Sequence, residues 1–269
     1  MSSWSFLFVQ QTVYGICNLS LVPCRKEPSD KCEMVTQLLF GEHFTVLESQ
    51  EKWSRIRIES DGYECWIDNK QYLPLSITTF NQLSHSPCFY TTELAQVIGT
   101  PQGGAIPVLL GSTLPAFSKT ECKVEDHIWK YEGQHTPAGI KTERSGLIET
   151  AMLYLHAPYL WGGRSPFGID CSGFTQMVYR LNGKQLLRDA YQQASEGSLL
   201  SFIEEAETGD LAFFDNAEGH IIHVGIILNG SRIIHASGQV RIDSFDHHGI
   251  YNAETRKYSH NLRMIRKIV

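Results

Sequence analysis

Gly168-Ile169-Asp170-Cys171-Ser172-Gly173-Phe174 is the most informative stretch of this 269-residue chain. It comes shortly after two adjacent glycines in Tyr159-Leu160-Trp161-Gly162-Gly163-Arg164, which mark a tight turn. The apolar residues beyond it have helical spacing: Phe174, Met177, Val178 and Leu181. This pattern stops at Asn182-Gly183, a pair that commonly ends helices. The sequence therefore predicts a tight turn followed by a helix that begins at Cys171.

Two histidines follow on apolar segments that have the composition of strands. His223 lies in Ile222-His223-Val224-Gly225-Ile226, 52 residues after Cys171, and His235 lies in Ile233-Ile234-His235-Ala236-Ser237, 64 residues after it. Between them, Asn229-Gly230 is typical of a two-residue hairpin turn. We therefore expect the two histidines to lie side by side on neighbouring antiparallel strands.

A cysteine at a helix start, with two strand histidines, suits nucleophilic catalysis. The N–H groups and partial positive charge of a helix N-terminus favour the thiolate, the form of cysteine that attacks carbonyl carbon. His223 can take the thiol proton and return it to a leaving amine, and His235 can orient His223. The backbone N–H groups of Cys171 and Ser172 can hold an oxyanion. Cysteine and histidine are also zinc ligands, but their long, unpaired spacing favours catalysis, so we expect no metal and no other cofactor.

Residues from about 142 to 269 resemble the NlpC/P60 family of cysteine peptidases, which cleave peptides of bacterial cell walls. Six segments carry the resemblance, in this order: residues 157–163, 168–174, 188–190, 209–214, 223–226 and 234–237. The resemblance implies a papain-like α+β domain. It also implies that Cys171 is the nucleophile, His223 the base and His235 the residue that orients the base.

Further residues are expected to line the substrate cleft. Tyr159 matches a tyrosine that lines the active site of family members, and Trp161 is expected either as packing or as a wall of the cleft. Asp170 can cap the helix that begins at Cys171, reach the substrate, or do both. Ser172 and the Arg188-Asp189 pair complete the cleft residues expected on this part of the chain.

Asp189 is the residue from which a substrate preference is inferred. It suits the N-cap of a short helix at residues 190–193, and an acidic side chain near the cleft can also pair with an ammonium group. In the resembling enzymes that recycle wall peptides, the matching aspartate binds the free amine of an N-terminal L-alanine. An acidic residue and a tyrosine of an SH3-like domain assist it there. Glu33 and Tyr63 stand at those two positions in this sequence.

The first 141 residues have the pattern of short strands between turns. Residues 1–75 contain expected strands at 19–23, 37–47 (with a turn at Gly41-Glu42), 53–58 and 63–67, and residues 1–10 are a first strand or its lead-in. Short strands at this spacing indicate a small barrel, and their order resembles a bacterial SH3-like domain. Residues 76–141 are expected to form a second, divergent SH3-like barrel, with strands at 105–111, 114–117 and 127–131.

The expected fold is therefore multi-domain: one or two all-β SH3-like barrels, followed by an α+β papain-like NlpC/P60 catalytic domain at residues 142–269. In that last domain, a helix that starts at Thr142 or Glu143 precedes the helix of Cys171. Strands are expected at 211–214, 221–228, 232–236, 239–242 and 262–268. Helices followed by a run of antiparallel strands are typical of α+β domains.

Composition and charge restrict the partners and the compartment. The net charge is −6 and no basic run occurs, so we expect no nucleic-acid partner. No apolar run approaches the ~20 residues of a membrane helix, so no membrane partner is expected, and residues 1–10 lack the basic flank of a signal peptide. The seven cysteines are odd in number and form no C-x-x-C pair, which is typical of a reducing compartment. We expect a cytoplasmic monomer.

The sequence thus predicts an enzyme that hydrolyses the amide between γ-D-glutamate and a diamino acid in murein peptides with a free N-terminal L-alanine. The diamino acid is meso-diaminopimelate or L-lysine, and such an activity serves the recycling of wall peptides. Two alternatives remain open. One is an exported or periplasmic peptidoglycan hydrolase that acts on the intact wall, and the other is a non-catalytic wall-binding protein.

Overall fold

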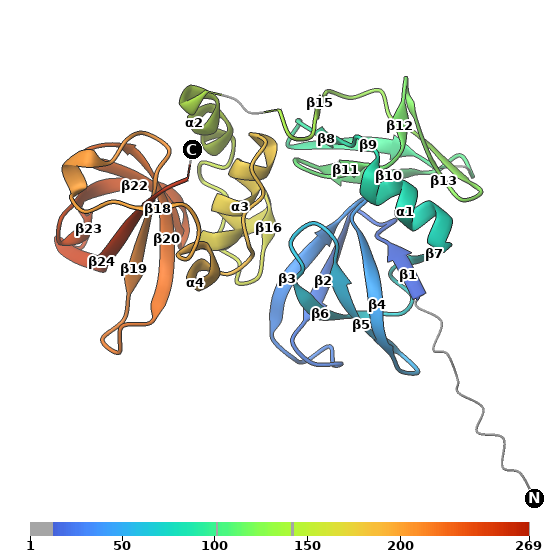
Figure 1. The fold of residues 1–269 in the computed structure, drawn as a ribbon, viewed down its shortest axis with the longest axis horizontal. Helices are drawn as coiled ribbons and strands as arrows, with labels where there is room; N and C mark the ends of the chain where they lie inside the picture. The colour runs from blue at the N-terminus through green and yellow to red at the C-terminus, as the bar shows by residue number, and fades with distance from the viewer. Residues whose placement is uncertain (1–12, 101, 141–142, 269) are drawn as a thin grey trace, which may run out of the picture.

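The computed structural model describes residues 13–100, 102–140 and 143–268, so the strand or lead-in predicted for residues 1–10 lies outside the described residues. Figure 1 shows three regions: a blue sheet that follows the N-terminus, a cyan-to-green region of short strands beside it, and a yellow-to-red region of helices and a curved sheet. Within the described ranges, no helix is long and apolar enough to cross a membrane.

The first region is an antiparallel sheet of seven strands. Strands β1 to β7 are Val13–Ile16, Leu21–Arg25, Met34–Leu39, His43–Ser49, Trp53–Ile58, Glu64–Asp68 and Leu73–Leu75, and they pair in the order β3-β2-β6-β5-β4-β1-β7. Burial alternates along β5, as the period of a strand with one core-facing side requires. All four strand segments predicted between residues 19 and 67 overlap with strands of this sheet, whereas β1 and β7 were not predicted.

Gly41 explains why the chain turns between β3 and β4. Its φ is +80°, a conformation that favours glycine, and a Cβ atom there would lie 2.0 Å from the backbone oxygen of Thr113. The Thr113 N–H also donates to the Phe40 carbonyl oxygen at 2.9 Å. The predicted turn is thus also the place where the first region meets the second, backbone against backbone.

The second region consists of a helix and two small sheets. Helix α1 is Ile77–His85, and strands β8 to β15 are Phe89–Thr91, Ala95–Gly99, Ala105–Leu109, Thr113–Leu114, Phe117–Ser118, Glu121–Val124, His127–Lys130 and His135–Pro137. The sheets have the orders β10-β9-β14-β13-β12 and β11-β8-β15. The strands predicted at 105–111 and 127–131 correspond to β10 and β14. The single strand predicted at 114–117 is wrong, because Pro115 has no N–H to pair and Ala116 has a φ of +46°.

The first two regions share one hydrophobic core. Phe80 of α1, Ile16 and Phe40 of the first region and Trp129 of β14 belong to a single buried cluster. The Phe40 and Trp129 rings meet edge to face, with centroids 5.5 Å apart. Helix α1, which was not predicted, covers this shared core and begins at a Ser76 cap whose side chain accepts from the Thr79 N–H.

The third region packs three helices against a closed sheet. The helices are α2 (Arg144–Leu153), α3 (Cys171–Leu181) and α4 (Ala190–Gln193), with a 3₁₀ turn at Ile203–Glu205. Two two-residue strands precede α3, namely β16 (Arg164–Ser165) and β17 (Gly168–Ile169). A third, β18 (Ser198–Leu199), follows α4. Strands β19 to β24 are Leu211–Asp215, Ile221–Asn229, Arg232–Ser237, Gln239–Asp246, Gly249–Asn252 and Lys257–Lys267. All three helices and all five strands predicted for this region are present.

Strands β19 to β24 form a six-stranded barrel. The sheet order is β18-β24-β19-β20-β21-β22-β23, and an additional pairing between β23 and β24 closes it. One buried cluster, which includes Phe214, Ile233 and Phe245, lies on the inward side of these strands. A second cluster joins the outward side of the strands to α2 and α3. The closure was not predicted, because β23 is a four-residue strand without a clear pattern of its own.

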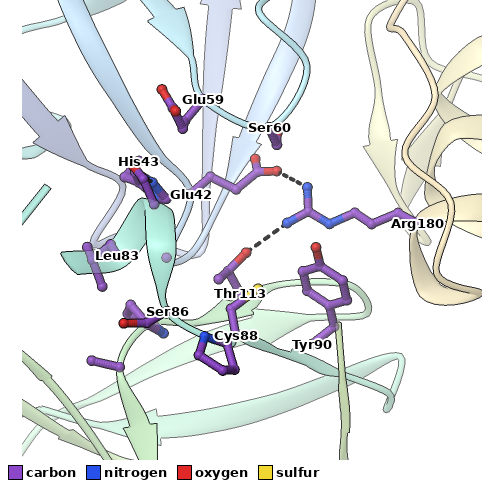
Figure 2. Close-up of a pocket in the computed structure, with 15 residues that line it drawn as sticks. Glu42, His43, Glu59, Ser60, Leu83, Ser86, Cys88, Tyr90, Thr113 and Arg180 are labelled. Atoms are coloured by element: carbon purple, nitrogen blue, oxygen red, sulfur yellow. Dashed lines mark hydrogen bonds and ion pairs between the residues drawn. The ribbon is translucent and has the colours of Figure 1, made fainter. Parts of the chain in front are cut away.

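A buried group of charges joins the first region to α3. The Glu42 carboxylate accepts hydrogen bonds from both Nη atoms of Arg164, at 2.8 and 3.0 Å, and from Nη1 of Arg180 at 2.5 Å. Figure 2 shows Arg180 between Glu42 and Thr113, with the Tyr90 ring below its guanidinium group, whose carbon is 4.4 Å from the ring centroid. A cavity of about 250 Å³ adjoins this group. Buried ion pairs between charged side chains therefore hold α3 against the first region.

Candidate active site

Cys171 is the first residue of α3, as the sequence predicts, and Asp170 is the N-cap of that helix. The Asp170 carboxylate accepts from the Gly173 N–H at 2.7 Å and from the Gly162 N–H at 2.8 Å. One carboxylate therefore holds both the helix start and the glycine turn in front of it. The capping role predicted for Asp170 is confirmed.

Arg188 also holds the start of α3, through hydrogen bonds to Asp170 and Ser172. Its Nη atoms bond the Asp170 carboxylate at 3.1 and 2.7 Å, Nη1 also donates to the Ser172 hydroxyl at 2.9 Å, and Nε donates to the Thr36 hydroxyl at 2.9 Å. The side chain is only 1% exposed and is not among the residues that line the cleft described below. Arg188 was predicted as a cleft residue, but its donors are used inside the protein, where they fix the position of the nucleophile helix.

The thiol of Cys171 is held in its protonated form. Burial raises its pKa to about 12, and the neighbouring Asp170 carboxylate acts in the same direction. The backbone N–H groups of Val224 and Ser172 point at the sulfur and lower the pKa, without overcoming the burial. The helix start thus favours the thiolate without offsetting burial, so the predicted role of a base that accepts the proton as the sulfur attacks is needed here.

His223 of β20 and His235 of β21 are both buried and lie side by side. The nitrogen atoms His223 Nε2 and His235 Nδ1 are 2.8 Å apart. In the register of β20 and β21, Gly225 is opposite His235, and a Cβ atom at Gly225 would lie 2.9 Å from the Cβ atom of His235. The absence of a side chain at Gly225 thus leaves room for the two rings to meet. The hairpin predicted from Asn229-Gly230 is confirmed.

Asp243 of β22 continues the chain of hydrogen bonds and was not predicted. His235 Nε2 is 3.0 Å from its Oδ2 atom, and Arg241 pairs with the same carboxylate at 2.7 Å. Although burial raises the pKa of Asp243, the hydrogen bonds from His235 and Arg241 hold it below its ordinary value. The carboxylate is therefore charged, so His235 Nε2 must be the donor.

This hydrogen-bond chain assigns the proton positions of both histidines. Because His235 donates from Nε2 to Asp243, its Nδ1 is an acceptor, and it accepts from Nε2–H of His223. The remaining nitrogen of His223, Nδ1, then carries a lone pair that can take a proton from a thiol. Burial lowers the pKa of His223 well below its ordinary value, and the neighbouring His235 and His260 act in the same direction. His223 is thus a neutral base at neutral pH.

Asp243 gives a test of this assignment. Replacing it with asparagine removes the charge that fixes His235, so we expect kcat to fall by roughly 10- to 100-fold, less than the 10²–10⁴-fold contribution of a general base itself. KM should not change, because Asp243 does not line the cleft. Steady-state kinetics check this, with Asp246→Asn on the same strand as the matched control. A kcat of Asp243→Asn within twofold of the wild type would contradict a role of the Asp243–His235–His223 hydrogen bonds in catalysis.

Cys171 opens onto a cleft of about 740 Å³. Its lining contains eight of the eleven residues predicted from the sequence: Glu33, Tyr63, Tyr159, Trp161, Asp170, Cys171, Ser172 and Asp189. Lys26, Glu64, Tyr191 and Ile222 also line it and were not predicted. The cleft lies between the first region and the third, so residues more than 100 positions apart in the sequence meet across it.

Asp189 and Tyr63 meet across the cleft. The Tyr63 hydroxyl is 3.3 Å from both oxygen atoms of the Asp189 carboxylate, and the Asp189 N–H donates to the Gln192 side chain at 2.9 Å. Burial raises the pKa of Asp189, and no ion pair with this carboxylate is formed within the described ranges of the chain. Arg188 acts against this rise, but burial outweighs it, so a ligand that brings a positive charge to the carboxylate is favoured.

Glu33 and Trp161 form a second link across the cleft. The indole N–H of Trp161 donates to Glu33 at 2.8 Å, and Lys26 lies 3.6 Å from the same carboxylate. Tyr159 lines the cleft near the nucleophile, since burial and the nearby Cys171 raise the pKa of its hydroxyl. Both predicted aromatic residues are therefore in the cleft, and Glu33 already has a donor and a cation as neighbours.

The histidine cluster is the one place in the described residues where a metal ion finds several candidate ligands together. Nitrogen atoms of His223, His235 and His260 lie within 4.8 Å of one another. The His223 and His235 nitrogens that face each other share a hydrogen bond, and the His260 ring stacks on that of His223 with planes 22° apart. Stacked rings do not converge on one ion, because imidazole lone pairs lie in the ring plane. The geometry favours proton transfer over metal binding.

Comparison with known protein families matches two parts of the chain. Residues 156–259 match the NlpC/P60 family, and residues 24–71 match the bacterial dipeptidyl-peptidase Sh3 domain. Gamma-D-glutamyl-L-lysine dipeptidyl-peptidase of Bacillus subtilis (strain 168) is 28% identical over 214 residues, which cover 75% of this chain and 71% of that protein. Dipeptidyl-peptidase 6 of Lysinibacillus sphaericus is 38% identical over 117 residues, which cover 41% of this chain and 40% of that protein.

Solved structures share the fold over nearly the whole chain. An NlpC/P60 family protein from Bacillus cereus superposes with a TM-score of 0.80 at 20% identity, covering 94% of this chain and 99% of that one. An NlpC/P60 endopeptidase from Photobacterium damselae subsp. piscicida superposes with a TM-score of 0.73 at 16% identity, covering 94% and 70%. At these identities the likeness concerns the fold, and it extends through all three regions.

Proposed function

We propose that this chain is an NlpC/P60 cysteine peptidase that hydrolyses the amide between γ-D-glutamate and a diamino acid in murein peptides with a free N-terminal L-alanine. The matches of residues 156–259 to the NlpC/P60 family and of residues 24–71 to the bacterial dipeptidyl-peptidase Sh3 domain support this proposal. The diamino acid is L-lysine or meso-diaminopimelate. Two relatives support the choice of bond, since both are named gamma-D-glutamyl-L-lysine dipeptidyl-peptidase. The product expected from such a substrate is the dipeptide L-Ala-γ-D-Glu.

The observation that carries the proposal is the Asp189 carboxylate in the cleft of Cys171. It is half-buried, it is bonded by the Tyr63 hydroxyl at 3.3 Å, and it lacks an ion-pair partner in the part of the chain that the structure describes. A substrate ammonium group would donate charge-assisted hydrogen bonds to this carboxylate, whose orientation the Tyr63 hydroxyl fixes. Glu33, held by Trp161 and Lys26, adds a second acidic wall to the same cleft.

The proposed reaction uses the hydrogen-bond chain that ends at Asp243. The Cys171 sulfur attacks the γ-carbonyl carbon of the substrate while its proton passes to Nδ1 of His223. The tetrahedral intermediate collapses as His223 returns that proton to the leaving amine, which departs as the diamino acid. Water then attacks the thioester with His223 again as the base, and the dipeptide leaves with a free γ-carboxyl group. Through these steps His235 and Asp243 keep His223 in the required tautomer.

We propose further that this activity serves the recycling of wall peptides by a cytoplasmic monomer. In the intact wall the amine of L-alanine is blocked by a lactyl group, so a requirement for the free amine spares the wall and admits its turnover products. The proposed arrangement has SH3-like barrels at residues 1–75 and 76–141 and a papain-like α+β catalytic domain at 142–269. The helix-start cysteine packed on a closed barrel supports this assignment of the last domain.

Mass spectrometry of reaction products tests the proposal. We expect L-Ala-γ-D-Glu to be released from L-Ala-γ-D-Glu-L-Lys or from the diaminopimelate tripeptide, and no fragment to be released from purified sacculi. Cys171→Ala is the control in both reactions. Fragments released from sacculi at a similar rate would replace the proposal with a wall hydrolase, and no product from either substrate would support a binding protein.

Asp189→Asn is expected to lower kcat/KM for the free tripeptide by at least roughly 30-fold, since losing one partner of a desolvated charge pair costs about 2 kcal/mol or more. Asparagine is also a good N-cap, so α4 should keep its structure. The same variant should leave the slow cleavage of an N-acetylated tripeptide unchanged within threefold. Equal losses on both substrates would mean that Asp189 supports the fold and does not recognise the amine. Tyr63→Phe is expected to show the same pattern with a smaller loss.

A further inference from the structure

His260 lies against the face of the proposed base. This residue of β24 is half-buried, and its ring is stacked on that of His223, with centroids 4.1 Å apart and planes 22° apart. It also meets Phe214 and His235 edge to face, with centroids 6.0 and 5.8 Å away. The His223 ring is thus held by His235 at one edge and by His260 over one face.

Two irregularities in β24 direct His260 into the barrel. Against β23, the pairing passes from Ile250↔His260 to Tyr251↔Tyr258, which leaves Ser259 as an extra residue. Against β19, the pairing passes from Phe213↔Met264 to Phe214↔Leu262, which leaves Arg263 as an extra residue. Bulges of this kind re-aim side chains, and they are frequent next to active sites.

A glycine on the neighbouring strand fixes the backbone at the same point. Gly249 of β23 has a φ of +137°, and a Cβ atom there would lie 1.9 Å from the carbonyl oxygen of His260. Only glycine fits both the conformation and the close approach. One glycine and two bulges therefore determine where the His260 ring lies.

We propose that His260 is a positioning residue for His223, which holds the imidazole toward Cys171 and keeps water from the face of that ring. This inference rests on the proposed function. In the step concerned, the sulfur–carbon bond forms as the proton moves from sulfur to Nδ1 of His223, so this transfer depends on the orientation of the His223 ring.

The surroundings keep His260 neutral when the reaction takes place. Burial lowers its pKa to about 4, with His235 acting in the same direction and Asp243 against it. The Ser259 hydroxyl also lies beside it, 2.9 Å from Nδ1. At neutral pH the ring therefore offers its π-face to His223 and adds no charge that would oppose the proton transfer.

Two variants separate stacking from other roles of the side chain. His260→Phe keeps an aromatic face, so we expect kcat within about threefold of the wild type. His260→Ala removes the packing that holds the imidazole and should lower kcat by roughly 10- to 30-fold, less than the about 10²-fold that a 1 Å misplacement can cost. KM should stay unchanged, because His260 does not line the cleft.

The pH dependence gives a second readout. In His260→Ala, water reaches His223 and the effect of burial on its pKa weakens, so the acid limb of kcat/KM should move up toward pH 6.5, whereas in His260→Phe it should stay where the wild type has it. Equal kinetics and equal acid limbs for the wild type and His260→Ala would overturn the proposal. Equal impairment of the two variants would do so as well.

A titration without turnover keeps this test separate from the proposed function. The ring nitrogens of His223, followed by NMR in the Cys171→Ala background, should titrate at a higher pH after His260→Ala and at an unchanged pH after His260→Phe. If the wild type fails to cleave the tripeptide, the proposed function is wrong, and this titration alone decides whether His260 controls His223. Identical titration curves in all three proteins would reject the positioning role.

Discussion

Cys171→Ala is expected to lower kcat on the free tripeptide by at least about 10⁴-fold, because removing the nucleophile of a peptidase leaves only binding and electrostatic stabilisation of the transition state. The reason is specific to this site. No other described cysteine lines the cleft, and His223 has no other thiol within the cleft from which to take a proton. Mass spectrometry of the released dipeptide over several hours measures a loss of this size.

The variant should remain folded, since Asp170, Arg188 and the glycine turn hold the start of α3 without help from the thiol. Cys171→Ser is the matched variant: it places a hydroxyl where the thiol was, and we expect it to be nearly as inactive as alanine because a hydroxyl gives up its proton far less readily than a thiol. Residual activity above 1% of the wild type in either variant would show that another group carries the reaction.

Glu42→Gln is expected to reduce the free energy of unfolding by about 3–5 kcal/mol, the usual consequence of removing one partner from a buried ion group. The amide keeps the shape of the side chain but leaves the Arg164 and Arg180 guanidinium groups without a counter-charge in the interior. Chemical denaturation followed by tryptophan fluorescence measures the change. Glu48→Gln is the control, because Glu48 pairs with Arg55 at the surface, where such pairs contribute roughly 0–1 kcal/mol.

The pKa of Glu42 determines how the free energy of unfolding changes with pH. Burial raises the pKa of Glu42, but Arg164 and Arg180 outweigh it and hold the pKa at about 2, below the value of 4.5 expected when unfolded. Its contribution to stability is therefore complete above pH 4.5 and is lost as the pH falls toward 2. The difference between wild type and Glu42→Gln should shrink over that range. A difference below 1 kcal/mol at pH 7 would contradict the role of Glu42 at this junction.

The parts of the site that the sequence predicts are those set by local pattern. Cys171 at a helix start, with Asp170 as its cap, follows from the apolar spacing after the glycine turn. The contact between His223 and His235 follows from two strands joined by Asn229-Gly230. In each case the residues that determine the geometry lie within about a dozen positions of one another.

The residues that the sequence did not reveal depend on strand register and on closure of the barrel. Asp243 reaches His235 only because β22 pairs with β21 in one register, with His235 opposite Arg241. His260 reaches His223 only because β23 closes the barrel and two bulges turn β24. Neither the register nor the bulges leave a signal that composition or periodicity shows.

Burial separates the predicted cleft residues into two kinds. Arg188 and Asp189 are adjacent in the sequence and equally polar, yet Arg188 is bonded beneath the nucleophile helix while Asp189 faces the cleft. Because successive residues before a helix point in different directions, the sequence pattern could not tell which of them meets a ligand. The same limit applies to residues 76–141, where strands of two to five residues leave no reliable period.

The most direct test of the account is a competition between L-Ala-γ-D-Glu-L-Lys and its N-acetylated form in one reaction with the wild-type protein. The ratio of their consumption rates, followed by mass spectrometry, equals the ratio of kcat/KM. We predict that the free tripeptide is consumed at least roughly 30-fold faster, with release of L-Ala-γ-D-Glu and lysine. Equal consumption of the two peptides, or cleavage between alanine and glutamate, would contradict the proposed recognition of a free amine beside a cysteine nucleophile.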